Sequence, residues 1–407
     1  MILYKTNLYL FDNTNVTTDT GLTNEMKTYY SDYLIDLAEP YLVHDQFGQK
    51  QPIPQNKGKT IEFRKYSPLP KALTPLTEGV TPSGQKLTMS VITATVAQYG
   101  GYVELSDILI MTAIDNNQVQ ATKLLAAQAG RTLDTITREV LAGGTNVQYA
   151  EGAHSTRATL VSGEATGNDY MTVDCVRKAV RYLKVMNAQK INGDFVGIIH
   201  PDVSYDLMSD PKWVNVKTYS DPDGIYEGEI GKIEGVRFVE TSEAKIFEGT
   251  PLTAGSKTLT VKTASSSSTS LAVNEAITAD DATALAGRTV LIGTAAATIA
   301  SATAGAAGSA SLTLSAAASI AKDTVIAPDD AGAGGAAVYA TLILGDNAYG
   351  VTEVSGGGLQ YISKQLGSAG TADPLNQRAT CGWKATKVAE RLVEEYMVRI
   401  ETTSTFS

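Results

Sequence analysis

The feature that most constrains the fold of this chain is a proline-rich stretch, SPLPKALTPLTEGVTPSG, at residues 67–84. It carries four of the thirteen prolines in the sequence. Proline fixes φ, lacks an N–H and pushes the preceding residue towards extended conformations. The stretch therefore cannot be a helix and would serve poorly as a central strand, and it is too long for an ordinary loop. We interpret it as a stiff, extended arm that the chain cannot easily bury in its own core.

Two strand-like segments flank the proline-rich stretch. Residues 58–66 (GKTIEFRKY) alternate apolar and polar side chains, and residues 85–105 are rich in Thr and Val and begin with the same period of two. Together they predict a long β-hairpin with a wide, proline-stiffened tip. Because an isolated two-stranded hairpin is only marginally stable in water, we expect it to lie on another surface.

Charge is distributed unevenly along the chain. The net charge of −10 argues against a protein that grips nucleic acid over its whole surface, so any contact with DNA should be weak or local. Between residues 50 and 71, however, Glu62 is the only acidic residue, and the basic residues are Lys50, Lys57, Lys59, Arg64, Lys65 and Lys71. This segment is either a solvated surface or a basic arm that docks on an acidic surface of another copy of the chain.

The strongest helical pattern follows the hairpin. Apolar residues recur every three or four positions from residue 116 to residue 142, with Asp115 as N-cap and Gly143-Gly144 as the stop. A helix of this length is about 40 Å long, so it should span a domain.

The N-terminal part carries a weaker pattern. Residues 1–20 are polar and aperiodic, which is typical of a loose arm. Residues 23–37 predict a short helix with a Tyr-rich face that includes Tyr30 and Tyr33.

The later part of the chain alternates helical and strand-like patterns, as expected for a mixed α/β domain. We predict a strand at 157–161, a helix at 171–189 capped by Thr172, a buried strand at 195–200 and a closing strand near 396–401.

Residues 250–335 differ in composition from their surroundings. No aromatic residue occurs from Glu248 to Val338, and short alternating runs are spaced like the strands of a small all-β module. We interpret the segment as an inserted β domain, with 263–270 and 329–337 as hinge-like loops. The alternative is a disordered low-complexity segment.

Residues that could carry chemistry are few and scattered. The three histidines show no metal-binding spacing, and Cys175 and Cys381 form no CxxC pair. His200 follows a predicted strand, where we expect a capping or packing role rather than catalysis. The sequence therefore predicts no enzyme, metal site or cofactor. No apolar run reaches the length of a membrane helix, no secretory signal is evident, and two cysteines fit a reducing cytosol.

Several stretches resemble one family of phage proteins. They are EGEIGKIEGVRFVETSEA (227–244), HPDVSYDL (200–207), LGDNAYGV (344–351) and DPLNQRATCGWKATKVAERL (373–392). The most telling residues are Asp373, Pro374, Asn376, Gln377, Arg378, Gly382, Trp383 and Lys384. Together with the order of arm, hairpin, long helix and α/β domain, the chain resembles major capsid proteins of tailed bacteriophages with the HK97-like fold, in particular the N4-type family.

The resemblance implies an α+β, HK97-like capsid fold with an inserted small all-β domain. Its parts would be an N-terminal arm (1–49), an E-loop hairpin (50–106), a P-domain with a spine helix (107–170), an A-domain (171–249 and 336–390), the inserted domain (250–335) and a C-terminal P-domain strand (391–407).

The implied function is self-assembly into the icosahedral shell that encloses a double-stranded DNA genome. In this fold the E-loop lies across a neighbouring subunit. The expected interface residues are Lys57, Lys59, Arg64, Lys65, Pro68, Pro70 and Pro75 in the E-loop, and Tyr30 and Tyr33 in the N-terminal helix.

The resemblance also implies partners and a location. The partners are other copies of the chain in hexamers and pentamers, a portal, and separate scaffold or decoration proteins. Packaged DNA would make only weak, non-specific contact, and no membrane is involved. The protein would be assembled in the bacterial host cytoplasm and reside in the virion capsid. An encapsulin-like compartment protein and a sugar-binding adhesin are the rival interpretations, but the first would lack the N4-type stretches and the second should carry a secretion signal and exposed aromatic residues.

Overall fold

The computed structural model describes residues 42–406 of the 407, with gaps at 55, 67–68, 74, 77, 80, 82, 113–116, 153, 163–168, 214–230, 355–356 and 369–372. The helix predicted at 23–37, with Tyr30 and Tyr33, lies outside the described residues, as do Asp115 and Pro68. The chain divides into two compact units, one built mainly from 50–137 and 350–390, the other mainly from 138–349 and 391–407.

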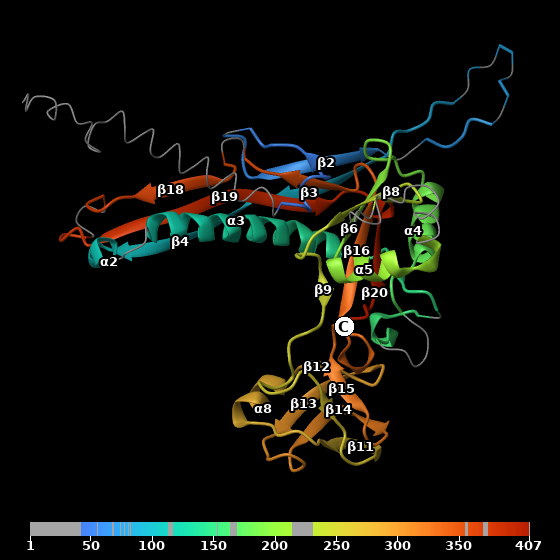
Figure 1. Cartoon of the computed structure of the whole chain (residues 1–407). Coiled ribbons are helices and arrows are strands. Elements are labelled where there is room, and N and C mark those ends of the chain that lie inside the picture. Colours follow the sequence, from blue (N-terminus) through green and yellow to red (C-terminus); the bar gives the residue numbers. More distant parts are fainter. Residues whose placement is uncertain are drawn as a thin grey trace, which may run out of the picture. The chain divides into compact units, whose positions relative to one another are not determined.

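The first unit contains the predicted hairpin (Figure 1). Strand β2 (Thr60–Tyr66) pairs antiparallel with β3 (Met89–Thr95), and the proline-rich stretch connects them. The next strand, β4 (Ala97–Ser106), pairs with β19 (Arg378–Arg391) over ten residue pairs. The sheet is completed by β18 (Gln360–Lys364), β17 (Tyr349–Thr352) and β1 (Gln49–Lys50). The predicted hairpin is confirmed.

Helix α3 (Asn117–Ala142) confirms the predicted long helix and covers this sheet. Its buried face places Leu125, Ala126, Ala129 and Leu133 against Cys381, Trp383 and Ala385 of β19. The spacing of three and four brings these apolar side chains to one face of the helix, and their burial stabilises the unit.

The second unit is built on a seven-stranded mixed sheet. Its order is β5 (Val147–Tyr149), β20 (Met397–Thr402), β16 (Val338–Leu344), β6 (Phe195–Ile199), β8 (Val236–Glu240) and β7 (Lys232–Ile233), with β9 (Ile246–Phe247) also pairing with β16. Helices α4 (Val173–Val185) and α5 (Pro201–Ser209) pack apolar faces into its core.

Two local predictions for this unit have different outcomes. The Thr172 hydroxyl accepts a hydrogen bond from the Cys175 N–H, so the predicted N-cap of α4 is confirmed. The strand predicted at 157–161 is wrong, because Arg157–Thr159 forms a 3-10 turn. Local bonds hold this turn: the Thr159 hydroxyl donates to the Thr156 carbonyl (2.7 Å), and the Leu160 N–H donates to the Arg157 carbonyl (3.0 Å).

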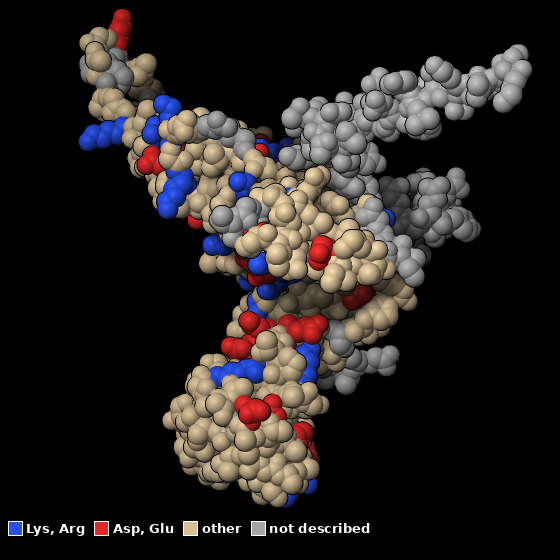
Figure 2. All heavy atoms as spheres, turned by 90° about the vertical axis from the view of Figure 1, so that its left-hand side faces the viewer, with Lys and Arg blue, Asp and Glu red and all other residues tan. Residues whose placement is uncertain are grey.

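The inserted segment is an ordered β domain. Six antiparallel strands follow the order β10 (Leu259–Thr260), β15 (Val325–Pro328), β12 (Thr289–Ile292), β13 (Ala295–Thr303), β14 (Ser311–Ile320) and β11 (Ser265–Ala272). An isolated bridge between Val261 and Val273, with the Lys262 N–H donating to the Ala272 carbonyl (2.8 Å), closes the sheet into a barrel. Its own core of Leu, Ile, Val and Ala side chains fills the interior, and few charged residues lie on the face that Figure 2 shows.

Two features of the inserted domain differ from expectation. Residues 263–270 are not a hinge but supply most of β11, which pairs with β14 and whose Ser265 hydroxyl donates to the Ala318 carbonyl (3.0 Å). A short helix, α8 (Ala279–Leu285), is capped by a reciprocal pair of bonds between Thr278 and Asp281. The disordered alternative is not supported.

The grouping of the C-terminal segments also differs from the expected one. Residues 350–390 belong with the hairpin and most of α3, not with 171–249, because β19 pairs with β4. Residues 391–407 belong with the α/β unit, because β20 pairs with β16 along six residue pairs.

Candidate functional site

The hairpin arm, residues 57–96, exposes apolar side chains that the described part of the chain does not cover. Near its base Phe63 and Ala94 are buried. Towards the tip, Leu73 and Leu76 are 81% and 78% exposed, and Leu69, Leu87, Met89 and Val91 are also exposed. Exposed apolar side chains gathered on one element mark an interaction surface. The arm therefore has the surface of a binding element.

The predicted basic residues of the arm are largely solvent-exposed. Lys57 and Lys59 are exposed and make no ion pair with any residue that the structure describes. Arg64 lies 3.7 Å from Glu62, with both side chains more than half exposed, so this pair is weak. Lys65 is in β2, and its side chain is not described; Pro70 and Pro75 are exposed. The structure thus leaves Lys57, Lys59 and Arg64 exposed on the hairpin arm.

A second exposed apolar surface was not anticipated. Helix α2 (Asp107–Thr112) has no buried residue, although Ile108, Leu109, Ile110 and Met111 make up most of it. A stable isolated helix of six residues is not expected in water. The run ILIM without polar alternation was the available sequence signal.

The motif that the sequence predicts at residues 373–384 lies beside α2, and its described contacts are structural. The Asp373 carboxylate accepts from the Arg378 N–H (2.8 Å), which closes a turn with Asn376 at a φ of 54°. Its neighbour Gln377 accepts a hydrogen bond from the Asp107 N–H through its carbonyl (3.0 Å). Pro374 is exposed in the same turn. The motif therefore fixes the entry into β19 and the position of α2.

The remaining motif residues build the pairing of β19 with β4. Gly382 lies opposite Tyr102, and a Cβ on it would come within 2.9 Å of the Gly101 carbonyl oxygen. Trp383 is buried, and its indole N–H donates to the Gln128 side chain on α3 (3.1 Å). Lys384 is exposed. These residues specify close strand packing rather than a chemical site.

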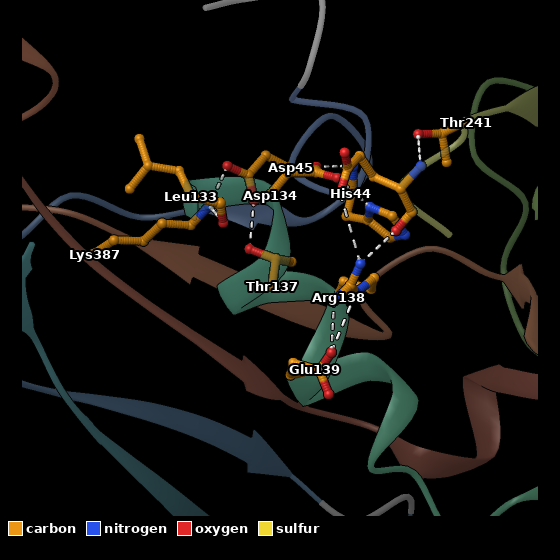
Figure 3. Close-up of polar contacts among 10 residues, drawn as sticks. His44, Asp45, Leu133, Asp134, Thr137, Arg138, Glu139, Thr241 and Lys387 are labelled. Carbon is orange, nitrogen blue, oxygen red and sulfur yellow. Dashed lines mark hydrogen bonds and ion pairs between the residues drawn. The ribbon is translucent and has the colours of Figure 1, made fainter. Parts of the chain in front are cut away.

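A buried polar cluster anchors residues 42–46 within the first unit (Figure 3). The His44 Nδ1 lies 2.6 Å from the Asp134 carboxylate, which also accepts the His44 backbone N–H (2.8 Å). The Thr137 hydroxyl donates to Asp45 (2.5 Å). Both Asp134 and Thr137 are on α3, so the segment is tied to that helix at two points.

Lys387 of β19 completes this cluster. Its ammonium group contacts the Asp45 carboxylate and donates to the Leu133 carbonyl (2.7 Å). Burial lowers the pKa of Lys387, and Asp45 acts in the opposite direction. A cavity of about 530 Å³ lies alongside, lined by Asp45, Lys387 and Glu353 among others. Sequence spacing gave no sign of this cluster, because its members are far apart along the chain.

The structure offers little for catalysis or metal binding. In the parts of the chain that are described, no three His, Cys, Asp or Glu side chains are grouped to hold a metal ion. His200 accepts from the Asp202 N–H (3.2 Å) and caps α5, as predicted, and burial lowers its pKa. No described helix is long and apolar enough to cross a membrane.

Comparison with known proteins decides the family. A family model described as phage capsid protein matches residues 110–365, more than half of the chain. The chain belongs to the phage capsid protein family. No curated protein sequence matches it significantly.

A solved capsid structure shares this fold. The cyanophage Pam1 capsid is similar with 14% identity and a TM-score of 0.51, covering 87% of each chain. The Ralstonia phage GP4 capsid (12% identity, TM-score 0.49) covers 88% of this chain and 87% of its own, and the cyanophage P-SCSP1u capsid (13%, 0.48) covers 88% and 86%. The predicted HK97-like fold is confirmed.

The chain is therefore a phage major capsid protein, and it forms the shell of the virion. Its role is structural, not enzymatic. Among its described residues, the first unit exposes two apolar surfaces, one on the hairpin arm and one on α2.

Proposed function

We propose that this capsid protein builds an icosahedral shell from hexamers and pentamers, in which the hairpin arm of one copy lies across the first unit of its neighbour. The observation that carries this proposal is the exposed arm itself, with apolar residues towards its tip and exposed cations on β2 or just before it. Proline stiffening reduces the entropy lost when the arm docks. The net acidic remainder of the chain supplies complementary charge.

In the terms of the fold, we propose the arm as the E-loop and α3 as the spine helix. Lys57, Lys59, Arg64 and Lys65 would form its charged contacts, with Pro68, Pro70 and Pro75 keeping it extended. Tyr30 and Tyr33 would add a contact from the N-terminal helix.

Further assignments rest on the stretches of sequence that resemble N4-type capsid proteins. We propose membership of that branch, in a tailed phage with a double-stranded DNA genome. The shell would be assembled in the bacterial cytoplasm with a portal and separate scaffold or decoration proteins. Packaged DNA would touch the shell only weakly, since the chain is acidic.

Charge reversal on the arm tests the docking. Changing Lys57, Lys59, Arg64 and Lys65 to Glu should leave the subunit folded, because the described members are exposed, yet reduce shell formation by about tenfold or more. Electron microscopy with sedimentation velocity measures assembly, and circular dichroism measures folding. The matched control changes four dispersed lysines to Glu: the exposed Lys123, Lys322 and Lys364, and the half-buried Lys257. Normal shells from the arm variant would refute arm docking.

A further inference from the structure

A second basic segment of this acidic chain has no role in the function proposed above. Residues 175–193 contain no acidic residue and five basic ones: Arg177, Lys178, Arg181, Lys184 and Lys190. In a chain with a net charge of −10, a run of this length with one sign of charge is a distinct local feature.

Helix α4 sorts these residues onto one face. Its buried side holds Val173, Cys175, Val176, Ala179, Val180 and Leu183. The five basic residues, here called the α4 basic face, are all exposed on the other side or just after the helix. The charge therefore faces outward from the second unit.

The α4 basic face is only partly neutralised by its own chain. Arg177 pairs with Asp174 and Glu234, each at 2.9 Å, and Lys178 lies 3.6 Å from Glu151. Among the described residues, Arg181 and Lys184 form no ion pair. Lys190 helps to lower the pKa of the nearby Asp194 carboxyl and lies 5.7 Å above the Phe195 ring.

The spacing of the charges suits a regularly charged polyanion. Arg177, Arg181 and Lys184 recur at four and three residues, so they follow one line along the helix. Seven residues at about 1.5 Å each span roughly 10 Å, which corresponds to about three nucleotides of one DNA strand. A shallow hollow of about 320 Å³ beside this line is lined by the same residues with Val180, Val185 and Glu234.

We propose that the α4 basic face is where the capsid protein contacts the phosphate backbone of packaged double-stranded DNA. This inference rests on the proposed function, which puts the genome inside the shell. Phosphate contacts by Lys and Arg are independent of sequence and sensitive to salt. The face presents no exposed aromatic side chain for stacking bases, so it suits duplex rather than single-stranded DNA.

A salt titration tests the inference on the full chain. Binding of the unassembled protein to a labelled 30-bp duplex of arbitrary sequence is measured by fluorescence anisotropy from 25 to 200 mM KCl. The test variant is Arg181→Gln with Lys184→Gln and Lys190→Gln. The matched control, Lys123→Gln with Lys322→Gln and Lys364→Gln, removes the same charge from dispersed, exposed positions.

We expect the test variant to bind about tenfold more weakly at 50 mM KCl. The slope of log affinity against log salt should be shallower by about 2 to 3, because each lost phosphate contact removes about 0.9. The control should stay within about twofold of the wild type, since its lysines are not clustered. Equal loss in both variants, or no loss in the test variant, would overturn the inference.

A footprint on the wild type covers the case in which the variant does not fold. Acetylation of Lys184 and Lys190, read by mass spectrometry, should fall several-fold when the duplex is added. No protection would overturn the inference. Protection on assembly without DNA would make the face a contact between copies and would also overturn the inference.

Electron microscopy of the same wild-type sample separates this inference from the proposed function. Shells without duplex binding leave the proposed function standing, and an absence of shells counts against that function.

Discussion

At the scale of single residues, Lys387 shows how a buried charge holds the first unit together. It is 5% exposed, and its partners come from the N-terminal segment (Asp45) and from α3 (Leu133). Burial lowers the pKa of Lys387, so the ammonium form is held at a desolvation cost. The pair therefore specifies where the segment docks more than it adds net stability.

Truncating Lys387 tests this view. Lys387→Ala should destabilise the first unit by about 3–5 kcal/mol, because it leaves the partly buried Asp45 carboxylate without its cation. Urea unfolding followed through the fluorescence of Trp383, which lies in the same unit, measures the loss. Adding Asp45→Asn should restore part of the stability. A loss below about 1 kcal/mol would mean that water already solvates this pair.

At the scale of elements, α2 is a helix without a core of its own. Its four apolar residues are 42% to 74% exposed. Such a helix is explained if another copy in the shell covers it.

Polar substitution of α2 separates folding from assembly. Ile108→Ser with Met111→Ser should change the free energy of unfolding by no more than about 0.5 kcal/mol, because neither side chain is buried. Shell formation should fall several-fold. The comparison variant Leu124→Ser alters another exposed apolar residue, on α3, and should assemble normally. If both variants assembled equally well, α2 would not be a contact in the shell.

The sequence predicted those elements whose signals are local and periodic. Helix α3, the capped α4 and the β2–β3 hairpin carried clear periods, turns or caps. Residues 263–270 were misread because Ser and Thr resemble a linker, and only pairing with β14 makes them a strand. The 3-10 turn at Arg157–Thr159 was missed because local hydrogen bonds outweigh the β-propensity of its neighbours.

Only part of the candidate site could be predicted from the sequence. Proline content and charge pointed to the arm. The exposed α2 and the His44–Asp134 cluster depend on tertiary context, which spacing in one sequence does not encode.

At the scale of the whole molecule, the inserted domain begins and ends at one strand pair and makes few other contacts with the α/β core. Among these, the Ala333 N–H donates to the Leu160 carbonyl (2.8 Å), and Arg157 pairs with Asp330 (3.1 Å). Phe247 of β9 lies opposite Val338 of β16, so the chain leaves and re-enters the seven-stranded sheet at adjacent positions. The domain also has a separate hydrophobic core. It can therefore be removed without opening the core of the sheet.

Deletion tests the role of this domain in the shell. Replacing residues 248–337 with a short Gly-containing turn should leave a folded protein that still assembles into shells, as judged by electron microscopy. This outcome would favour a decorating role in contact with the host surface or with a decoration protein. Loss of assembly with the subunit still folded would instead give the domain a structural role at contacts between capsomers.

The closure of the inserted barrel has a consequence for particles in suspension. An open sheet edge on one molecule is a small hazard, but a shell repeats every surface many times, and weak edge pairing between particles would then be multiplied into avidity. The bridge from Val261 to Val273 closes that edge where β10 and β11 meet. A coat that carries this domain in every subunit therefore gains bulk with less exposed strand edge for particles to pair through.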